Sequence, residues 1–432
     1  MIKRDKYLNK IISKQNNGLI KVITGVRRSG KSYLLNFIYK NYLLDHGVNE
    51  NNIIMLALDE DINIKYRNPI LLGEYIREKI INKDEQYYIF LDEIQKVENI
   101  QNPYIDNKES LITFVDVLLG LMKIPNCDIY VTGSNSKMLS SDILTEFRDR
   151  GDEIRIYPLS FKEFYDYKKI DKSDAYREYI TYGGLPLAIL KDNHEDKSKY
   201  LKDLFNKTYL KDVLERNDIK NNQEEIDELL NIISSSMGSL TNPLKLSNTF
   251  KSVRKINITS QTISKYLDYF IDAFILDKVY RYDIKGKKYI NTPLKYYYTD
   301  VGLRNARLNF RQQEENHIME NVVYNELKLR GFDVDIGVVE YNYKDENGKN
   351  KRKQLEVDFI ASKFNKKYYI QSALTISNED KLDQELNSLK RINDSFKKVI
   401  LVKENIMPWY DNNGILYLGI YDFLLNEDSL DI

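Results

Sequence analysis

Residues 25 to 32, with the sequence Gly-Val-Arg-Arg-Ser-Gly-Lys-Ser, have the spacing of a phosphate-binding (Walker A) loop. Gly25 and Gly30 let the backbone turn and come close to a phosphate without an intervening Cβ, so successive N–H groups can point at the anion. Lys31 can neutralise the β- and γ-phosphates, and the Ser32 hydroxyl can ligate Mg²⁺. The residues expected to contact the nucleotide are Gly25, Arg28, Ser29, Gly30, Lys31, Ser32 and Tyr33.

The elements on either side of this loop support the interpretation. Ile20, Val22 and Ile23 form an apolar, β-branched run that stops at Gly25, and a helical pattern opens at Ser32. The alternative is a glycine-rich turn that happens to carry Lys-Ser. That alternative does not explain why a strand ends and a helix begins at the two places that the motif requires.

An acidic pair, Asp92 and Glu93, follows a second buried run at residues 87 to 91. This is the form of a Walker B site, in which Asp92 holds Mg²⁺ through water and Glu93 polarises the attacking water as a general base. Two carboxylates after a strand can also merely cap a helix. An additional strand at residues 53 to 58, between the loop and the pair, marks the class of P-loop ATPase that carries its own glutamate base.

Polar residues follow a third buried strand, predicted over residues 127 to 132. Ligands lie at the carboxyl edge of a parallel sheet, so Ser134 and Asn135 are candidates for sensing the γ-phosphate and holding the attacking water. A polar turn without such a role is the alternative.

Two arginines, Arg148 and Arg150, end the next predicted helix, which begins near residue 137. An arginine delivered to a neighbouring subunit's γ-phosphate would stabilise charge in the transition state, and hydrolysis would then need a homo-oligomer. Helix C-termini also favour arginine electrostatically without any catalytic role.

Composition sets outer limits on the function. A length of 432 residues suggests roughly three domains, and the equal numbers of Lys+Arg and Asp+Glu (65 each) require any basic surface to be local. A single cysteine, Cys127, excludes an internal disulfide framework, and three scattered histidines argue against a Cys/His metal site. No run approaches the ~18 apolar residues of a membrane span, so a soluble, cytoplasmic protein without membrane contact is expected.

Several runs, taken in order, give a resemblance to a known family. GVRRSGKS, YIFLDEIQ, VTGSNSKML, IRIYPLSFKEF and TYGGLPLAIL resemble the AAA-type ATPases of bacteria and archaea that carry a C-terminal domain of unknown function. The resemblance implies an AAA nucleotide domain, a winged-helix segment and a terminal domain similar to restriction-endonuclease-like cores. Members usually have Gly-Arg where this chain has Arg-Asp-Arg at residues 148 to 150, so an arginine is kept and the glycine is not.

The fold class expected is therefore α/β, with a parallel-sheet P-loop domain followed by three smaller parts. The predicted domains are an ATPase domain over 1–160, a helical lid over 161–225, a winged helix over 226–312 and an inactive endonuclease-like α/β domain over 313–432.

The predicted winged helix is the basic part of the neutral chain. Residues 241 to 300 contain eleven Lys and Arg against five Asp and Glu, an excess of six positive charges. A helix-turn-helix pattern followed by a hairpin with Gly286 at its tip fits DNA binding through phosphate contacts. Winged helices also serve as protein-docking modules, which remains the alternative. The residues expected to contact DNA are Lys251, Arg254, Lys255, Lys265, Lys285, Lys287 and Lys288.

The last predicted domain carries part of a nuclease signature. Glu320 in a helix and Asp358 in a strand are two of the carboxylates that would hold Mg²⁺, but Gln371-Ser372-Ala373 stands where Glu-x-Lys belongs. We interpret Glu320, Asp358 and Gln371 as a degenerate nuclease site, kept for folding or for binding nucleic acid or a partner. A strand at 415–420 is expected at the edge of this domain's sheet.

Together these patterns predict an ATP-binding, Mg²⁺-dependent ATPase that couples its nucleotide state to DNA binding. A protein-remodelling or scaffold ATPase whose C-terminal domains bind protein is the alternative, and a metal-dependent DNA-cleaving defence enzyme is the third hypothesis.

Overall fold

The computed structural model describes residues 2–133, 150–217, 219, 223–311, 314–344, 346, 348–375 and 379–432. The chain forms two compact units. Unit 1 contains Met1–Pro158 and Asp272–Phe274, and unit 2 contains Leu159–Ile271 and Ile275–Ile432.

Unit 1 is built on a five-stranded parallel sheet with the strand order β2-β3-β6-β1-β7. Its strands are β1 (Ile20–Thr24), β2 (Ile53–Ala57), β3 (Tyr87–Asp92), β6 (Cys127–Thr132) and β7 (Gly151–Arg155). Because the strands are parallel, their carboxyl ends meet at one edge, and β6 separates the end of β1 from the end of β3.

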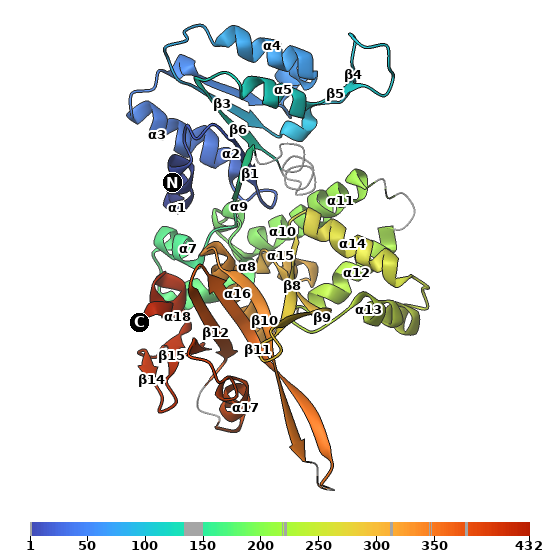
Figure 1. Cartoon of the computed structure of the whole chain (residues 1–432), viewed down its shortest axis with the longest axis vertical. Helices are drawn as coiled ribbons and strands as arrows, with labels where there is room; N and C mark the ends of the chain where they lie inside the picture. The colour runs from blue at the N-terminus through green and yellow to red at the C-terminus, as the bar shows by residue number, and fades with distance from the viewer. Residues whose placement is uncertain are drawn as a thin grey trace. The chain divides into compact units, whose positions relative to one another are not determined.

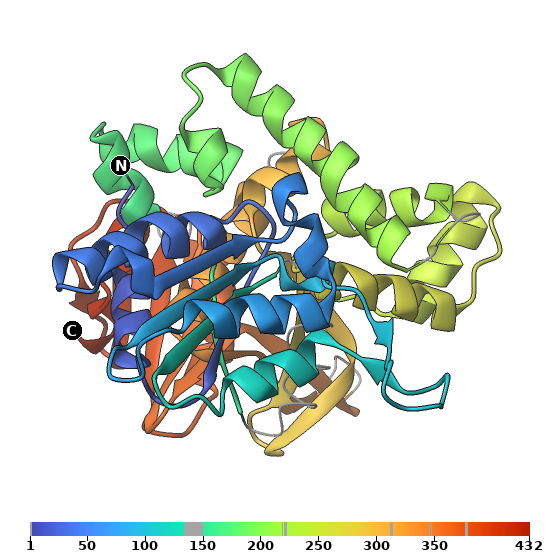
Figure 2. The same ribbon diagram turned by 90° about the horizontal axis from the view of Figure 1, so that it is seen from above.

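Helices cover both faces of this sheet (Figures 1 and 2). Leu72 and Ile76 of α4 and Leu118 of α5 pack on one face, whereas Tyr7 of α1 and Leu34 pack on the other. The helical elements are α1 (Asp5–Ser13), α2 (Lys31–Tyr33), η1 (Leu34–Tyr39), α3 (Lys40–Asp45), η2 (Glu50–Asn52), η3 (Asp61–Arg67), α4 (Pro69–Lys79), η4 (Ile94–Lys96) and α5 (Phe114–Leu121). A short ribbon pairs β4 (Ile100–Gln101) with β5 (Leu111–Ile112).

Local capping decides where two of these helices begin. The sequence pattern places a helix from residue 73, but α4 starts at Pro69 because the Asn68 side chain accepts hydrogen bonds from the next turn and proline fits the first helical position. The pattern also places a helix from residue 111. Thr113 and Asp116 form a capping box instead, so α5 starts at Phe114 and the preceding residues form β5.

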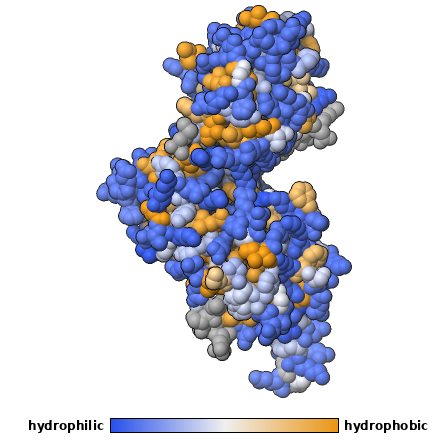
Figure 3. Space-filling model, turned by 90° about the vertical axis from the view of Figure 1, so that its left-hand side faces the viewer, coloured by the Kyte–Doolittle hydropathy of each residue, from blue (hydrophilic) through white to orange (hydrophobic). Residues whose placement is uncertain are grey.

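Unit 2 begins with helices and ends with a large sheet. Its helical elements are α7 (Phe161–Lys168), α8 (Lys172–Tyr182), α9 (Pro186–Ile189), α10 (His194–Leu204), η6 (Phe205–Tyr209), α11 (Leu210–Arg216), α12 (Gln223–Ser235), α13 (Pro243–Thr249), η7 (Phe250–Arg254), α14 (Ser260–Asp272), α15 (Val301–Arg307), α16 (Glu315–Leu329), α17 (Glu379–Lys390), α18 (Ile420–Leu425) and η8 (Ser429–Asp431). On the face drawn in Figure 3, hydrophilic residues predominate and hydrophobic residues gather in small patches, as on other folded proteins.

The sheet of unit 2 has eight strands in the order β14-β15-β13-β12-β11-β10-β8-β9. Its strands are β8 (Leu276–Asp283), β9 (Lys288–Tyr298), β10 (Asp333–Lys344), β11 (Asn350–Lys363), β12 (Lys366–Ala373), β13 (Lys397–Val402), β14 (Trp409–Tyr410) and β15 (Ile415–Gly419). The strand expected at the edge, residues 415–420, is instead covered by β14, which pairs with it antiparallel. That part of the prediction was wrong because β14 has only two residues and leaves no periodic pattern.

The hairpin expected to be the wing belongs to this same sheet. β8 pairs antiparallel with β9, and its end pairs parallel with β10, with Arg281 opposite Ile336 and Asp283 opposite Val338. The sheet therefore crosses the predicted boundary between residues 312 and 313, and the division into two domains at that point stays a prediction. The separate lid at 161–225 stays a prediction.

Candidate active site

The phosphate-binding loop has the backbone that its glycines predict. Gly25 adopts φ +132° and Gly30 adopts φ +97°, values that favour glycine. A Cβ on Gly25 would lie 2.1 Å from the carbonyl oxygen of Ile156, so no larger residue fits there. The loop therefore curls directly from the end of β1 into α2, which begins at Lys31.

Lys31 is buried with its ammonium group inside the loop. Its Nζ donates to the carbonyl oxygens of Gly25 at 2.9 Å and Val26 at 3.1 Å, and its side chain and backbone together are only 5% exposed. The positive charge is thus held at the concave side of a turn whose N–H groups favour an anion. Of the other residues predicted to contact nucleotide, Arg28 is exposed, Ser32 and Tyr33 are half-buried, and Ser29 is fully buried.

Asp92 and Glu93 lie at the same edge of the sheet as this loop and share a partner. The Thr132 hydroxyl, at the end of β6, donates to Asp92 Oδ1, and the Glu93 backbone N–H donates to Thr132 Oγ1 at 3.1 Å. Because β6 lies between β1 and β3, Thr132 stands between the phosphate loop and the acidic pair. One hydroxyl therefore fixes the carboxylate of one residue and the backbone of the next.

Glu93 adopts a backbone conformation that is rare for its residue type. Its φ is +53° and its ψ is +49°, in the left-handed region, and strained backbone of this kind is enriched at functional sites. The Glu93 carboxylate accepts a hydrogen bond from the Gln95 side-chain amide. The Gln95 Oε1 atom is buried and has no hydrogen-bond partner among the described residues.

Thr132 and Gln95 were not among the residues predicted from the sequence. The sequence signal for Thr132 is a polar side chain at the last residue of a buried strand. The sequence analysis selected Ser134 and Asn135, which follow that strand, instead. Those two residues, together with Arg148, lie outside the described residues.

Arg150 lies at the opposite end of the strands from the phosphate loop. Its carbonyl oxygen accepts a hydrogen bond of 3.0 Å from the Ile20 N–H, at the start of β1. A five-residue strand such as β1 spans about 16 Å, and the phosphate loop follows its other end. The backbone of Arg150 is therefore remote from the phosphate loop of its own chain, and an arginine finger at this position stays a prediction.

The side-chain oxygen atoms near the phosphate loop are of the kind that binds Mg²⁺. Mg²⁺ is typically bound by one or two protein oxygens, with water and substrate phosphates completing an octahedron. The Ser32 hydroxyl follows the phosphate loop, and the Asp92 carboxylate is held at the neighbouring sheet edge by Thr132. Within the described part of the chain, no three His, Cys, Asp or Glu side chains are grouped so as to hold a metal by themselves.

The lysines predicted to contact DNA are on the surface of unit 2. Lys251, Lys255 and Lys265 are exposed on η7, after it and on α14, respectively. Lys285, Lys287 and Lys288 are exposed at the turn between β8 and β9. Arg254 ends η7, and its side chain is outside the described set.

The three residues of the predicted degenerate nuclease site come from α16, β11 and β12, and two of them bond directly. The Gln371 amide donates to Asp358 Oδ1 at 3.0 Å, and the Asp358 N–H donates to Gln371 Oε1 at 3.2 Å. Burial, together with the nearby Glu320 carboxylate, raises the pKa of Asp358 to about 8. Lys295 of β9, which the sequence analysis did not include in this site, forms an ion pair with Glu320.

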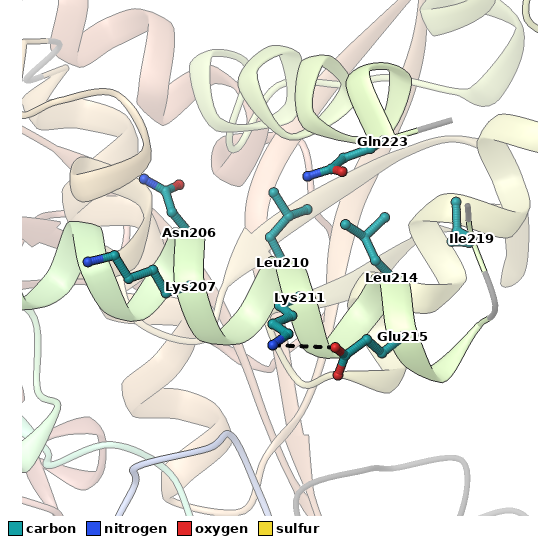
Figure 4. Close-up of a pocket in the computed structure, with 8 residues that line it drawn as sticks. All are labelled: Asn206, Lys207, Leu210, Lys211, Leu214, Glu215, Ile219 and Gln223. Carbon is teal, nitrogen blue, oxygen red and sulfur yellow. Dashed lines mark ion pairs between the residues drawn. The ribbon is translucent and has the colours of Figure 1, made fainter. Parts of the chain in front are cut away.

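A separate groove in unit 2 contains none of the predicted site residues (Figure 4). It has a volume of about 710 Å³ and runs along η6 and α11. Lys211 and Glu215 form an ion pair of 3.5 Å on its wall, as the dashed line in Figure 4 marks. The residues that line it are Asn206, Lys207, Leu210, Lys211, Leu214, Glu215, Ile219 and Gln223.

None of the helices in the described ranges combines the length and apolar character needed to cross a bilayer.

Comparison with known proteins finds similarity along nearly the whole chain. Residues 17–165 match the family model of an AAA domain, and residues 173–314 match a domain of unknown function (DUF8612). An uncharacterized protein of Haemophilus influenzae is 34% identical over 430 residues, which are 98% of this chain and 99% of that protein. An uncharacterized protein of Methanocaldococcus jannaschii is 30% identical over 375 residues, which are 83% of this chain and 76% of that protein.

Among solved structures, the Orc1 protein of Aeropyrum pernix in complex with DNA is 10% identical, with a TM-score of 0.31. The match covers 71% of this chain and 92% of that one. A similarity of this size is too weak to support an inference about this chain.

Proposed function

This chain belongs to the family of AAA-type P-loop proteins, and we propose that it binds ATP and hydrolyses it to ADP and phosphate. The observation that carries the proposal is the meeting of three strand ends at one sheet edge. The phosphate loop follows β1, Asp92 and Glu93 follow β3, and Thr132 between them bonds to both members of the acidic pair.

Each group has a separate role in this proposal. Backbone N–H groups of residues 25 to 30 and the Lys31 ammonium bind the phosphates. Ser32 and Asp92 would hold Mg²⁺, which, when bound with the nucleotide, neutralises charge on the phosphate oxygens. Glu93 accepts a proton from the attacking water, and Thr132 holds the backbone of Glu93 so that its carboxylate keeps a fixed position.

Replacement of Glu93 by glutamine tests this assignment. Because the amide cannot accept the proton, we expect turnover to fall at least about 100-fold while ATP binding is retained. Glu74→Gln, which changes an exposed carboxylate on α4 of the same unit, is the matched control and should hydrolyse ATP at the rate of the unmodified chain. Equal rates in Glu93→Gln and Glu74→Gln would remove Glu93 from the mechanism.

We propose as a second function that unit 2 binds DNA through residues 226–312. Three helices, α12, α13 and α14, precede the β8–β9 hairpin, and Thr241 forms an antiparallel bridge with Leu294 of β9. This order of helices followed by a hairpin supports the winged-helix interpretation. The hairpin turn carries three exposed lysines, Lys285, Lys287 and Lys288, in a chain without net charge.

A gel-shift titration of duplex DNA at two salt concentrations tests this second function. The triple variant with Lys285, Lys287 and Lys288 changed to Gln should bind DNA more weakly and with a shallower salt dependence, because fewer counterions are released. A control variant with Lys83, Lys108 and Lys123 changed to Gln loses the same charge from exposed sites in unit 1. Equal binding by the two variants would contradict a DNA contact at the hairpin and favour the protein-docking alternative.

A further inference from the structure

Lys295 is a buried lysine in a charged cluster of unit 2, here called the centre, with the carboxyl groups of Glu320, Glu356 and Asp358. It extends from β9 and is 3% exposed. Its Nζ lies 2.7 Å from Oε1 of Glu320 on α16 and 2.7 Å from Oε1 of Glu356 on β11. One ammonium group therefore joins a helix and a strand through two carboxylates.

The neighbouring groups complete this arrangement. The Tyr297 hydroxyl also donates to Glu320 Oε1. Asp358 accepts hydrogen bonds from the N–H of Ser372 at 2.8 Å and from its hydroxyl at 2.5 Å. The Lys295 charge acts on Asp358 as well as on Glu320. Although burial works in the opposite direction, Glu320 and Glu356 raise the pKa of Lys295, so the ammonium stays charged.

The residues at this centre do not fit the divalent metal ion that a nuclease of this type uses. The nuclease signature would hold that ion with Glu320, Asp358 and a glutamate at the position of Gln371. Gln371 supplies a neutral amide at the third position and is bonded to Asp358. The Lys295 ammonium already contacts the Glu320 oxygen that would coordinate the ion. Buried carboxylates need a compensating charge, and this lysine supplies one.

We propose that Lys295 is the built-in cation of this centre, where its ammonium takes the place of the divalent metal ion of a nuclease. The centre then holds α16 against the sheet by an internal ion cluster, and the unit does not cleave DNA with Mg²⁺. Removal of the ammonium is expected to open a site for a divalent cation at the Glu320 and Glu356 oxygens that it now contacts.

Calorimetric titration of Mn²⁺ into the full chain without nucleotide tests the proposal. The unmodified chain and Glu320→Gln should bind the same number of Mn²⁺ ions. Lys295→Ala should bind one more, and the double variant Lys295→Ala/Glu320→Gln should lose it again. A Mn²⁺ site in the unmodified chain that Glu320→Gln removes would overturn the proposal, and so would a folded Lys295→Ala variant that gains no site.

A second measurement covers the case in which Lys295→Ala does not fold. Lys295→Met keeps the length of the side chain and removes the charge, so its melting temperature should fall below that of the unmodified chain. Lys295→Met/Glu320→Gln removes the uncompensated carboxylate as well and should recover part of that loss. A double variant that melts no higher than Lys295→Met would show that Lys295 is not the counter-charge of Glu320.

Discussion

The Thr132 hydroxyl connects the two positions on which proposed catalysis depends. It donates to the Asp92 carboxylate and accepts from the Glu93 N–H, so it sets both the metal-binding group and the backbone of the base. Replacement of a residue that orients a metal ligand in this way typically lowers activity or metal affinity by about 10- to 100-fold.

We therefore expect Thr132→Val to lower ATP turnover by about 10- to 100-fold with little change in ATP affinity. Valine has nearly the same shape as threonine but neither donates to Asp92 nor accepts from Glu93. Thr132→Ser keeps the hydroxyl and is the matched control. Steady-state ATPase rates decide the matter, since equal turnover in the Val and Ser variants would show that the hydroxyl has no role.

At the scale of residues, the sequence predicted the groups whose role depends on local spacing. Gly25, Gly30 and Lys31 lie within one short motif, and Asp92 and Glu93 are adjacent, so residue type and order were enough to select them as candidates. The role of Thr132 depends on β6 lying between β1 and β3, which no local pattern shows. Lys295 was assigned to a different domain from Glu320, and only the shared sheet brings the two together.

At the scale of elements, one carboxylate links the start of α15 to the turn before α9. Asp300 caps α15 by accepting from the Leu303 N–H at 3.2 Å, and its other oxygen accepts from the Gly184 N–H at 2.7 Å. Burial raises the pKa of Asp300 to about 6, against an ordinary value of 3.8. No side chain larger than glycine fits at Gly183, where a Cβ would lie 2.0 Å from this carboxylate.

This cap predicts a pH-dependent stability. Between pH 4 and pH 6 the folded chain keeps a proton on Asp300 that the unfolded chain has lost, so this group lowers the free energy of unfolding as pH rises through that window. The total effect is about 3 kcal/mol, and above pH 6 it stays constant.

Asp300→Asn should remove that slope, because the amide does not titrate. Urea unfolding of both chains from pH 4 to pH 7 measures it as the difference between their free energies of unfolding. The prediction fails if this difference is the same at pH 4 and pH 6. Any hydrogen bond that asparagine loses at Gly184 or Leu303 shifts the difference by a constant and does not change its slope.

Elements with a strong hydrophobic periodicity were predicted well. The partner of a strand was predicted poorly where it lies far away in the sequence. Four of the five parallel strands of unit 1 follow apolar runs that the sequence shows directly, whereas β7 has the polar sequence Gly-Asp-Glu-Ile-Arg. The parallel pairing of β8 with β10 joins residues about 55 positions apart, Arg281 and Ile336. A hairpin pattern alone gives no information about such a partner, so the hairpin was assigned to a separate domain.

At the scale of the whole molecule, the position of Arg150 leads to a prediction about assembly. Its backbone lies at the end of the sheet away from its own phosphate loop, so a contribution to catalysis requires a second chain. We expect the ATPase rate per chain to rise with protein concentration as the homo-oligomer forms.

Mixing of two inactive variants tests this contribution. Lys31→Ala lacks a working phosphate loop but keeps Arg150, and Arg150→Ala keeps its phosphate loop but lacks the finger. The mixture should regain activity that neither variant has alone. A mixture of Lys31→Ala with Glu93→Gln is the control, since the base acts within its own chain and nothing should be regained. No recovery in the first mixture would exclude a finger at Arg150.

The central claim is that the loop at residues 25 to 32 holds a nucleoside triphosphate, and calorimetric titration of ATP with Mg²⁺ tests it most directly. The unmodified chain and Lys83→Ala, which changes an exposed lysine of the same unit, should each bind one ATP per chain with equal affinity. Lys31→Ala should show no binding in the same range. Absence of binding by the unmodified chain, or equal affinity in Lys31→Ala, would contradict the claim.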